Sequence, residues 1–201
     1  MPFFNAIQSH PSVESVIRFL QLQFASNLFN GNDIKELVLE LGEEEFFRMP
    51  SSLFNCRKLN RLELSRCELD PLRSFKGFLC LRNLNLHQVL ISHDAVENLI
   101  SKCPLLESLS LSYFNNLALT ICVPNLKYLY LESEFKDICL EDTPLLIEFS
   151  IAMYMTDDIA MHFEQNSNCN FVKFLGGVPN LEKLVGHTYF TKFLEVLERR
   201  D

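Results

Sequence analysis

A short apolar phrase recurs through most of this chain, and it constrains the fold more than any other feature. The phrase has three apolar anchors, with two residues between the first pair and one residue between the second pair. Its copies begin at Ile34, Leu59, Leu81, Leu106, Leu126, Leu146 and Leu181. The first six copies are separated by 25, 22, 25, 20 and 20 residues, and the last gap is 35 residues. Repetition with a period of this size indicates a solenoid, in which each unit packs mainly against its neighbours.

The second copy identifies the class of repeat. It continues through Cys67 and Leu69 and so completes the pattern L-x-x-L-x-L-x-x-N/C-x-L, which is the leucine-rich-repeat signature. Alternate residues of a strand point to opposite faces, so the anchors are expected to point inward. The sequence therefore predicts an α/β fold. We expect a leucine-rich-repeat solenoid, a curved horseshoe, with a parallel β-sheet on the concave face and helices or irregular segments on the convex face.

The chain divides into three predicted regions. Residues 1–33 are expected to be an N-terminal helical segment, a truncated or degenerate repeat, and the chain is expected to begin inside a repeat array because no polar cover for a solenoid end is evident there. Residues 34–187 are the predicted repeat array. Residues 188–201 are predicted to form a C-terminal helix, because Phe190, Phe193, Leu194 and Leu197 have helical spacing.

The segments between the strands differ in what they predict. Residues 92–102 are predicted to be an amphipathic helix with Ser92 as its N-cap, and residues 156–163 a second helix. The two 20-residue units have no helical period, so they are expected to return through extended or irregular backbone. Proline stands two residues before the first anchor in four units, where its fixed φ is expected to support an extended approach to the strand. These prolines are Pro104, Pro124, Pro144 and Pro179.

Composition excludes several classes of protein. A hydrophobic fraction of 48% excludes a disordered chain. The net charge of −8 argues against nucleic acid or an anionic membrane as the partner. We expect no secretory leader, because residues 1–4 lack a charged segment, and no apolar run approaches the roughly 18 residues of a membrane span. We therefore expect a protein of the cytoplasm or nucleus.

The sequence offers little for catalysis or metal binding. Its seven cysteines include no C-x-x-C pair, so we expect buried free thiols and no metal site. Asp157, Asp158 and His162 could suggest a metal site, but an acidic first turn of a helix is the simpler interpretation. No G-x-S-x-G elbow is present. We predict no enzyme activity, no catalytic residue and no cofactor.

Three stretches carry a resemblance to a known family. They are the phrase Cys-Pro-Leu-Leu-Glu-Ser-Leu at 103–109, the phrase Val-Pro-Asn-Leu-Lys-Tyr-Leu at 123–129 and the opening repeat at 38–56. With these, residues 34–186 resemble the repeat region of the plant F-box/FBD/leucine-rich-repeat family. The resemblance implies a protein-interaction module, the substrate-recognition part of an F-box-type (SCF) ubiquitin ligase receptor. We find no F-box motif in residues 1–33 and expect too little room for an FBD domain after Gly186, so Skp adaptor and cullin are expected as partners only if an F-box lies upstream.

The outward positions of the predicted strands form the candidate partner-binding surface. Tyr128 and Tyr130 are the strongest candidates on this surface, because exposed tyrosines are enriched at interface hot spots. Two alternatives stay open. One is a stand-alone or decoy binding protein without a ligase link, and the other is a small-molecule sensor with a pocket near the two tyrosines and segment 164–170. The predicted partner-binding residues are Arg61, Glu63, Asn83, Asn85, His87, Ser108, Ser110, Tyr128, Tyr130 and Glu132.

Overall fold

The computed structural model of the protein describes residues 34–40, 46–71, 74–115, 117–154, 178–187 and Phe190. The described part forms two compact units, Met1–Leu106 (unit 1) and Glu107–Asp201 (unit 2), and each is considered by itself. The predicted N-terminal helix, the helix at 156–163, segment 164–170 and the C-terminal helix beyond Phe190 lie outside the described residues. The limits of the three predicted regions therefore stay predictions.

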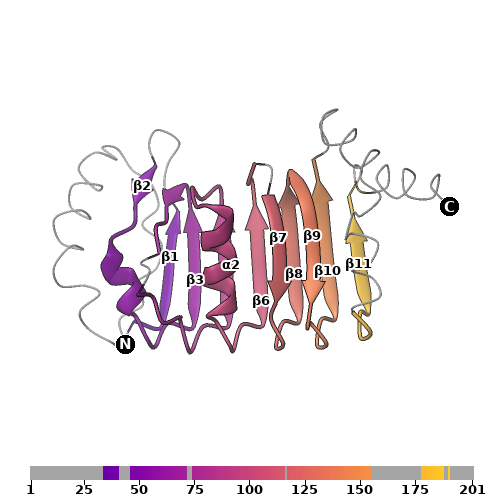
Figure 1. The fold of residues 1–201 in the computed structure, drawn as a ribbon, viewed down its shortest axis with the longest axis horizontal. Helices are drawn as coiled ribbons and strands as arrows, with labels where there is room; N and C mark the ends of the chain where they lie inside the picture. The colour runs from indigo at the N-terminus through magenta and orange to yellow at the C-terminus, as the bar shows by residue number, and fades with distance from the viewer. Residues whose placement is uncertain are drawn as a thin grey trace. The chain divides into compact units, whose positions relative to one another are not determined.

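Unit 1 is built on three parallel strands. They are β1 (Glu36–Glu40), β3 (Arg61–Ser65) and β5 (Asn83–His87), and β3 pairs with both of the others (Figure 1). The anchors lie in register, with Leu62 opposite Leu37 and Leu84. All of these anchors are buried, which confirms the predicted inward face in this unit.

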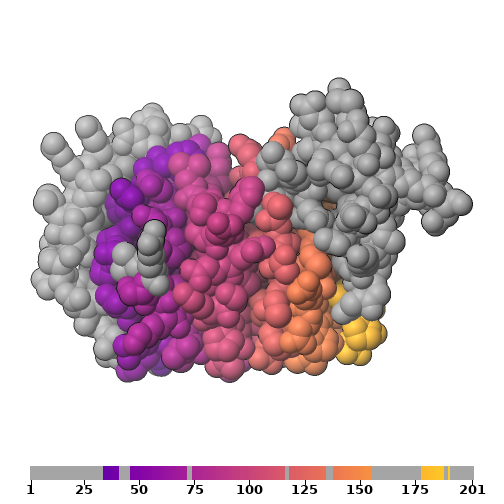
Figure 2. Space-filling model, in the orientation of Figure 1, coloured from indigo at the N-terminus to yellow at the C-terminus, as the bar shows by residue number. Residues whose placement is uncertain are grey.

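The return segments of unit 1 are mixed. They comprise β2 (Phe47–Arg48), a 3-10 helix η2 (Ser51–Asn55), β4 (Cys67–Glu68) and the helix α2 (His93–Ser101). Strands β2 and β4 form a small parallel sheet, and Glu68 also bridges to Leu90. In the space-filling view the indigo-to-magenta residues of this unit form a closely packed surface around α2 (Figure 2).

Helix α2 confirms the predicted helix at 92–102 and its N-cap position at Ser92, but not a capping hydrogen bond from the side chain. Ser92 has the extended backbone of an N-cap, yet its side chain makes no capping hydrogen bond. Val96, Leu99 and Ile100 are buried, so the helix is held chiefly by its apolar face. Among the described residues no helix is long and apolar enough to cross a lipid bilayer.

Three phenylalanine rings pack together in unit 1, next to the end of α2. The rings of Phe54, Phe75 and Phe78 lie 5.0 to 6.2 Å apart between centroids. The Lys102 ammonium, just after the helix, donates a 2.8 Å hydrogen bond to the Phe75 carbonyl. Gly77 has φ +100°, and a Cβ there would lie 2.0 Å from the Lys102 carbonyl oxygen. Glycine is required at this position because no other residue combines that backbone conformation with so close an approach.

Unit 2 is built on four described parallel strands. They are β6 (Ser108–Ser112), β8 (Tyr128–Ser133), β10 (Glu148–Met153) and β11 (Lys183–Gly186), which pair in that order. The central anchors Leu129 and Phe149 are buried at 2% and 0% exposure, as predicted. Leu184 was expected to be an inward anchor but is 41% exposed. Strand β11 ends the described sheet and pairs with β10 alone, so less of its surface is covered.

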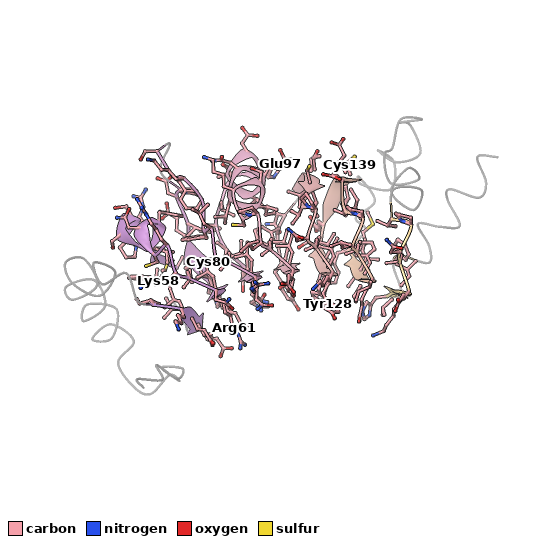
Figure 3. The ribbon with its side chains drawn as sticks, turned by 90° about the horizontal axis from the view of Figure 1, so that it is seen from below. Lys58, Arg61, Cys80, Glu97, Tyr128 and Cys139 are labelled. Carbon is pink, nitrogen blue, oxygen red and sulfur yellow. The ribbon has the colours of Figure 1, made fainter. Side chains whose placement is uncertain are left out.

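Two return segments of unit 2, those after β6 and after β8, contain strands. Strands β7 (Leu117–Cys122) and β9 (Phe135–Glu141) pair in parallel as a second sheet. This confirms the extended return predicted for the 20-residue units and corrects the expectation of helices or irregular segments on this side. Ile121, Ile138 and Leu131 are buried, which places the core of the unit between its two sheets. Seen from below, Cys139 of β9 and Tyr128 of β8 lie on opposite sides of the unit (Figure 3).

A repeated turn leads into the strands of both units. In each case the N–H of the first anchor donates to the carbonyl three residues earlier, as in Leu126 to Val123 at 3.1 Å and Leu59 to Cys56 at 3.3 Å. Proline takes the second position of four of these turns. This corrects the predicted extended approach, since the fixed φ of proline also suits the second position of a β-turn. The prolines in this position are Pro104, Pro124, Pro144 and Pro179.

Candidate partner-binding face

All ten residues predicted to bind a partner lie on strands, between buried anchors. They fall into two sets because the chain forms two units. The unit 1 face consists of Arg61, Glu63, Asn83, Asn85 and His87, and the unit 2 face of Ser108, Ser110, Tyr128, Tyr130 and Glu132. In each unit the labelled strand residue, Arg61 or Tyr128, lies on the side opposite the labelled return-segment residue, Glu97 or Cys139 (Figure 3). Whether these two surfaces bind a partner stays a prediction.

The unit 1 face is polar and partly neutralised within itself. Arg61 Nη2 and Nε lie 2.7 and 2.8 Å from Glu63 Oε1, which forms an ion pair along β3. Register places Asn83 beside Arg61 and Asn85 beside Glu63 on β5. An exposed ion pair of this kind adds little stability, but it uses donors that Arg61 could otherwise offer to a partner.

The unit 2 face is centred on one carboxylate. The Tyr130 hydroxyl donates to Glu132 Oε2 at 2.7 Å, and the Tyr154 hydroxyl donates to Glu132 Oε1 at 2.7 Å. The Tyr113 ring lies 6.3 Å from the Tyr154 ring between centroids, at an interplanar angle of 36°. Tyr113, Tyr130, Glu132 and Tyr154 therefore form one group, named here the tyrosine–glutamate cluster.

The ends of three neighbouring strands bring this cluster together. Tyr113 directly follows β6, and its N–H donates to the Glu132 carbonyl at 2.7 Å. Tyr154 directly follows β10, and its N–H donates to the Ser133 carbonyl at 3.0 Å. Glu132 stands near the end of β8, between the two. The parallel register thus places an aromatic residue on each side of the carboxylate.

The backbone at Tyr113 is a repeated feature of the fold. Tyr113 has φ +61°, and Arg66 and Gln88, which directly follow β3 and β5, have φ +56° and +52°. The Arg66 N–H donates to the His87 carbonyl at 3.0 Å, just as Tyr113 does to Glu132. Left-handed backbone is uncommon for residues other than glycine, so the turn imposes some strain at each position. The turn thus recurs after three strands, whereas an aromatic residue occupies it only at Tyr113 in unit 2.

Glu132 also shapes the acidity of its neighbours. Burial, followed by the hydrogen bond and charge of Glu132, raises the pKa of Tyr130 to about 12. The hydrogen bond to Glu132, followed by burial, raises the pKa of Tyr154 above its usual range. A negative charge nearby disfavours the tyrosinate form, so both hydroxyls stay protonated donors at neutral pH.

Half of this cluster was not predicted from the sequence. Tyr130 and Glu132 were predicted, whereas Tyr113 and Tyr154 were not, because they follow their strands and lie outside the alternation of the repeat phrase. A compositional signal could have found them. All five tyrosines of the chain lie after residue 107, and unit 1 has none.

Comparison with known proteins identifies the family. A family model described as "FBD-associated F-box protein At5g56370, LRR repeats" matches residues 26–162. The chain belongs to the plant F-box/FBD/leucine-rich-repeat family. It is 56% identical over 189 residues to F-box/FBD/LRR-repeat protein At1g13570 of Arabidopsis thaliana, an alignment that covers 94% of this chain and 43% of that protein. The resemblance seen in the repeat phrases is therefore confirmed.

Other relatives agree on the family. F-box/FBD/LRR-repeat protein At3g26920 of the same plant is 29% identical over 138 residues, which cover 67% of this chain and 32% of the relative. FBD-associated F-box protein At3g52670, also from Arabidopsis thaliana, is 27% identical over 168 residues, or 75% of this chain and 40% of the relative. The chain thus spans less than half the length of these F-box/FBD/leucine-rich-repeat relatives. No solved structure matches it.

The described thiols of this family member range from buried to exposed, with Cys139 half-buried. Burial raises the pKa of Cys56 and Cys103 to about 11 and that of Cys67 to about 12, so these three behave as the predicted inert core thiols. The prediction of burial is wrong for Cys80 and Cys122, which are exposed. Cys80 lies in the turn before β5 and Cys122 ends β7, and both positions point away from the core.

The described residues show no group of three or more histidine, cysteine or acidic side chains placed to hold a metal ion. Asp157, Asp158 and His162 lie outside that part of the chain. A pocket of about 320 Å³ opens in unit 1 between β4 and α2. It is lined by Glu68, Leu69, Asp70, Leu90, Ile91, Ser92 and Ala95. The small-molecule hypothesis placed its pocket beside the tyrosines of unit 2, so this hollow does not test it.

Proposed function

We propose that the chain is a protein-binding repeat module that forms the substrate-recognition part of an F-box-type (SCF) ubiquitin ligase receptor. Family membership supports the protein-interaction role, because the relatives are named for F-box, FBD and leucine-rich-repeat regions. The tyrosine–glutamate cluster is the observation that supports placing the partner-binding surface on unit 2. Skp adaptor and cullin enter it only through an F-box joined to this repeat region.

The physical character of the unit 2 face supports a protein partner. Tyr128 is 46% exposed and stands on β8 beside Ser108 and Glu148, so a flat partner surface can reach it. The Tyr130 and Tyr154 side chains are already held by hydrogen bonds, and ordered aromatic groups lose little conformational entropy on binding. Tyrosine is also enriched among the few residues that supply most of the binding energy of an interface.

Partner recovery tests the position of the binding surface. Tagged protein would be compared with the double variant Tyr128→Ala, Tyr130→Ala by affinity purification and quantitative mass spectrometry. We expect specific partners to fall by about tenfold or more, since hot-spot truncations cost about 2 kcal/mol or more. The matched control is the double variant Thr120→Ala, Glu141→Ala, which changes exposed residues of β7 and β9. If the tyrosine variant recovers the same amount of partner as the native protein, the unit 2 face is not the binding surface.

The ligase link has its own experiment. Endogenous protein would be immunoprecipitated, and its mass and partners read by mass spectrometry. A polypeptide well above the 23.3 kDa of this chain, recovered with Skp adaptor and cullin, is the expected result. A 23.3 kDa species recovered with neither protein would favour the stand-alone or decoy alternative and end the ubiquitin proposal. Thermal stabilisation by a small molecule in a metabolite screen would favour the sensor alternative.

A further inference from the structure

The tyrosine–glutamate cluster has the chemistry of a site for one kind of side chain. We infer that it binds the guanidinium group of an arginine presented by the protein partner. This inference rests on the proposed function, because it names the chemistry that the partner must offer. It concerns Tyr113, Tyr130, Glu132 and Tyr154, all within unit 2.

Charge is the first argument for a cationic group. Glu132 brings a carboxylate to a face whose other cluster members are neutral, and the whole chain has a net charge of −8. The two tyrosine hydroxyls orient this carboxylate by donating one hydrogen bond to each oxygen. A carboxylate has about four lone-pair sites, more than the two that the tyrosine hydroxyls use. A cation is attracted to this arrangement, and an anionic partner group would be repelled.

The aromatic rings give the second argument. Tyr113 and Tyr154 are 49% and 37% exposed, so parts of both rings are open to a partner. The face of an aromatic ring carries negative electrostatic potential and attracts a cation placed over it. The centroids of the two rings are 6.3 Å apart, and the ring planes are tilted by 36°. The Tyr154 hydroxyl also donates to Glu132, so the ring pair lies next to the carboxylate. A cation that reaches the carboxylate therefore also meets aromatic surface.

The combination favours arginine over lysine. A guanidinium group is planar, stacks on aromatic rings and donates through several N–H groups in a fixed fork. It can lie against a tyrosine ring while it donates to a carboxylate, and charge-assisted bonds of this kind are strong and directional. An ammonium group is a compact, strongly hydrated charge that can satisfy the carboxylate but gains less from the ring.

Two lysines of unit 2 pair with acidic residues where the strands begin, at the ends opposite Glu132. Lys127 lies 3.0 Å from Glu107, and Lys183 lies 2.6 Å from Glu148. The carboxylate of Glu132 lies at the other ends of the strands, where it accepts from two tyrosine hydroxyls.

Tyrosine NMR of the full 201-residue chain can test the inference directly. With ring-labelled tyrosine the spectrum holds signals from five residues, and Tyr113, Tyr130 and Tyr154 can be assigned by single substitutions. The probes are the N-acetyl amides of arginine, lysine and glutamine, because a single side chain isolates the chemistry of the site. We expect saturable shifts of the three cluster signals with the arginine probe, at an affinity at least threefold higher than for lysine, and none with glutamine.

Two variants and one control sharpen the test. Glu132→Gln keeps an acceptor for the tyrosines but removes the charge, and should weaken arginine binding at least tenfold. Tyr113→Leu keeps apolar surface but removes a ring face, and should weaken it severalfold. Glu141→Gln removes the same charge from exposed β9 and should leave binding unchanged. Circular dichroism of each variant would establish that the fold is retained.

Several results would overturn the inference. Equal shifts from the glutamine probe would mean that the cluster has no preference for a cation. Equal affinity for the arginine and lysine probes would contradict a preference for guanidinium. Undiminished arginine binding by Glu132→Gln would show that the carboxylate does not bind the probe. If the native chain does not bind the arginine probe, but partner recovery still depends on Tyr128 and Tyr130, this inference alone would be rejected. Arginine binding without any partner recovery would instead count against the proposed function.

Discussion

The two units use the same strand but return from it by different routes. In unit 1 the repeat anchors are 25, 22 and 25 residues apart, and the return segments include η2 and α2. In unit 2 the first two spacings are 20 residues, and the returns are the strands β7 and β9. A helix rises about 1.5 Å per residue and a strand about 3.3 Å, so a helix needs about twice as many residues to cover the same distance. The 20-residue spacing therefore suits an extended return, whereas the longer repeats of unit 1 leave room for helical turns.

The two faces differ in a second way. The turn after each of β3, β5 and β6 has the same left-handed backbone, at Arg66, Gln88 and Tyr113. Only in unit 2 does this turn carry an aromatic residue, and there it joins Tyr154 around Glu132. The repeat thus supplies equivalent backbone positions, while the individual side chains at those positions give each unit its own surface chemistry.

A charge in the core of unit 2 should have the largest effect. Leu109 is 1% exposed, so Leu109→Asp would bury a carboxylate without a partner. The cost is several kcal/mol, against a typical total stability of about 5–15 kcal/mol, and cooperative unfolding should be lost. Circular dichroism during heating measures this. Ser110→Asp, at the next and half-buried position, should melt nearly normally, and a normal melt of Leu109→Asp would contradict the assigned face of β6.

The junction of α2 with the phenylalanine cluster is the corresponding weak point of unit 1. Gly77→Ala would place a Cβ against the Lys102 carbonyl and force alanine into a φ of +100°. We expect destabilisation of about 1–3 kcal/mol or more, measured by denaturant unfolding. Ser74→Ala, in the same segment and exposed, is the control and should change stability by less than about 0.5 kcal/mol. Equal stability of the two variants would mean that the junction is not tightly packed.

One substitution in unit 2 should increase stability. Thr143 is 1% exposed, and its hydroxyl has no hydrogen-bond partner within the described part of the chain, whereas the equivalent turn positions hold Cys103, Val123 and Val178. Thr143→Val keeps the shape and removes a buried polar atom, so the free energy of unfolding should rise by about 1 kcal/mol. Denaturant unfolding measures the change. The control Thr120→Val, at an exposed site on β7, should have little effect, and a fall in stability for Thr143→Val would show that the hydroxyl is satisfied.

Alkaline titration gives the smallest and most local effect. The raised pKa of Tyr130, about 12, means that its neutral form is favoured in the folded state over the unfolded state, where the value is about 10. Its contribution to stability is therefore complete below about pH 10 and is lost as the pH rises toward 12. Because every tyrosine lies in unit 2, tyrosinate absorbance reports on that unit alone.

The variant Glu132→Gln gives the matched measurement. Without the charge, the titration of Tyr130 and Tyr154 should move to lower pH, while Tyr128→Phe should leave this high-pH component in place. Identical titration curves for the native chain and Glu132→Gln would contradict the role of Glu132 in the cluster.

Much of the fold followed from periodicity alone. The seven strand positions, the register of anchors such as Leu62 and Leu129, and the helix at 92–102 were predictable, because a strand buries alternate residues and a helix buries one face. The failures were local. The Ser92 side chain makes no capping hydrogen bond at the start of α2, Leu184 is exposed at the last described strand, and the four prolines enter turns, since each depends on neighbours that a local pattern does not contain.

The sequence by itself therefore determined the repeat, its apolar interior and the family to which the chain belongs. Only the tertiary structure decided that β7 and β9 pair as a second sheet, and that Tyr113 and Tyr154 meet at Glu132. Tyr113 and Tyr154 are 41 positions apart in the sequence, on two different repeats. Parallel stacking of β6, β8 and β10 brings their ends together, because each strand lies beside the equivalent strand of the next repeat and not beside its neighbours in sequence.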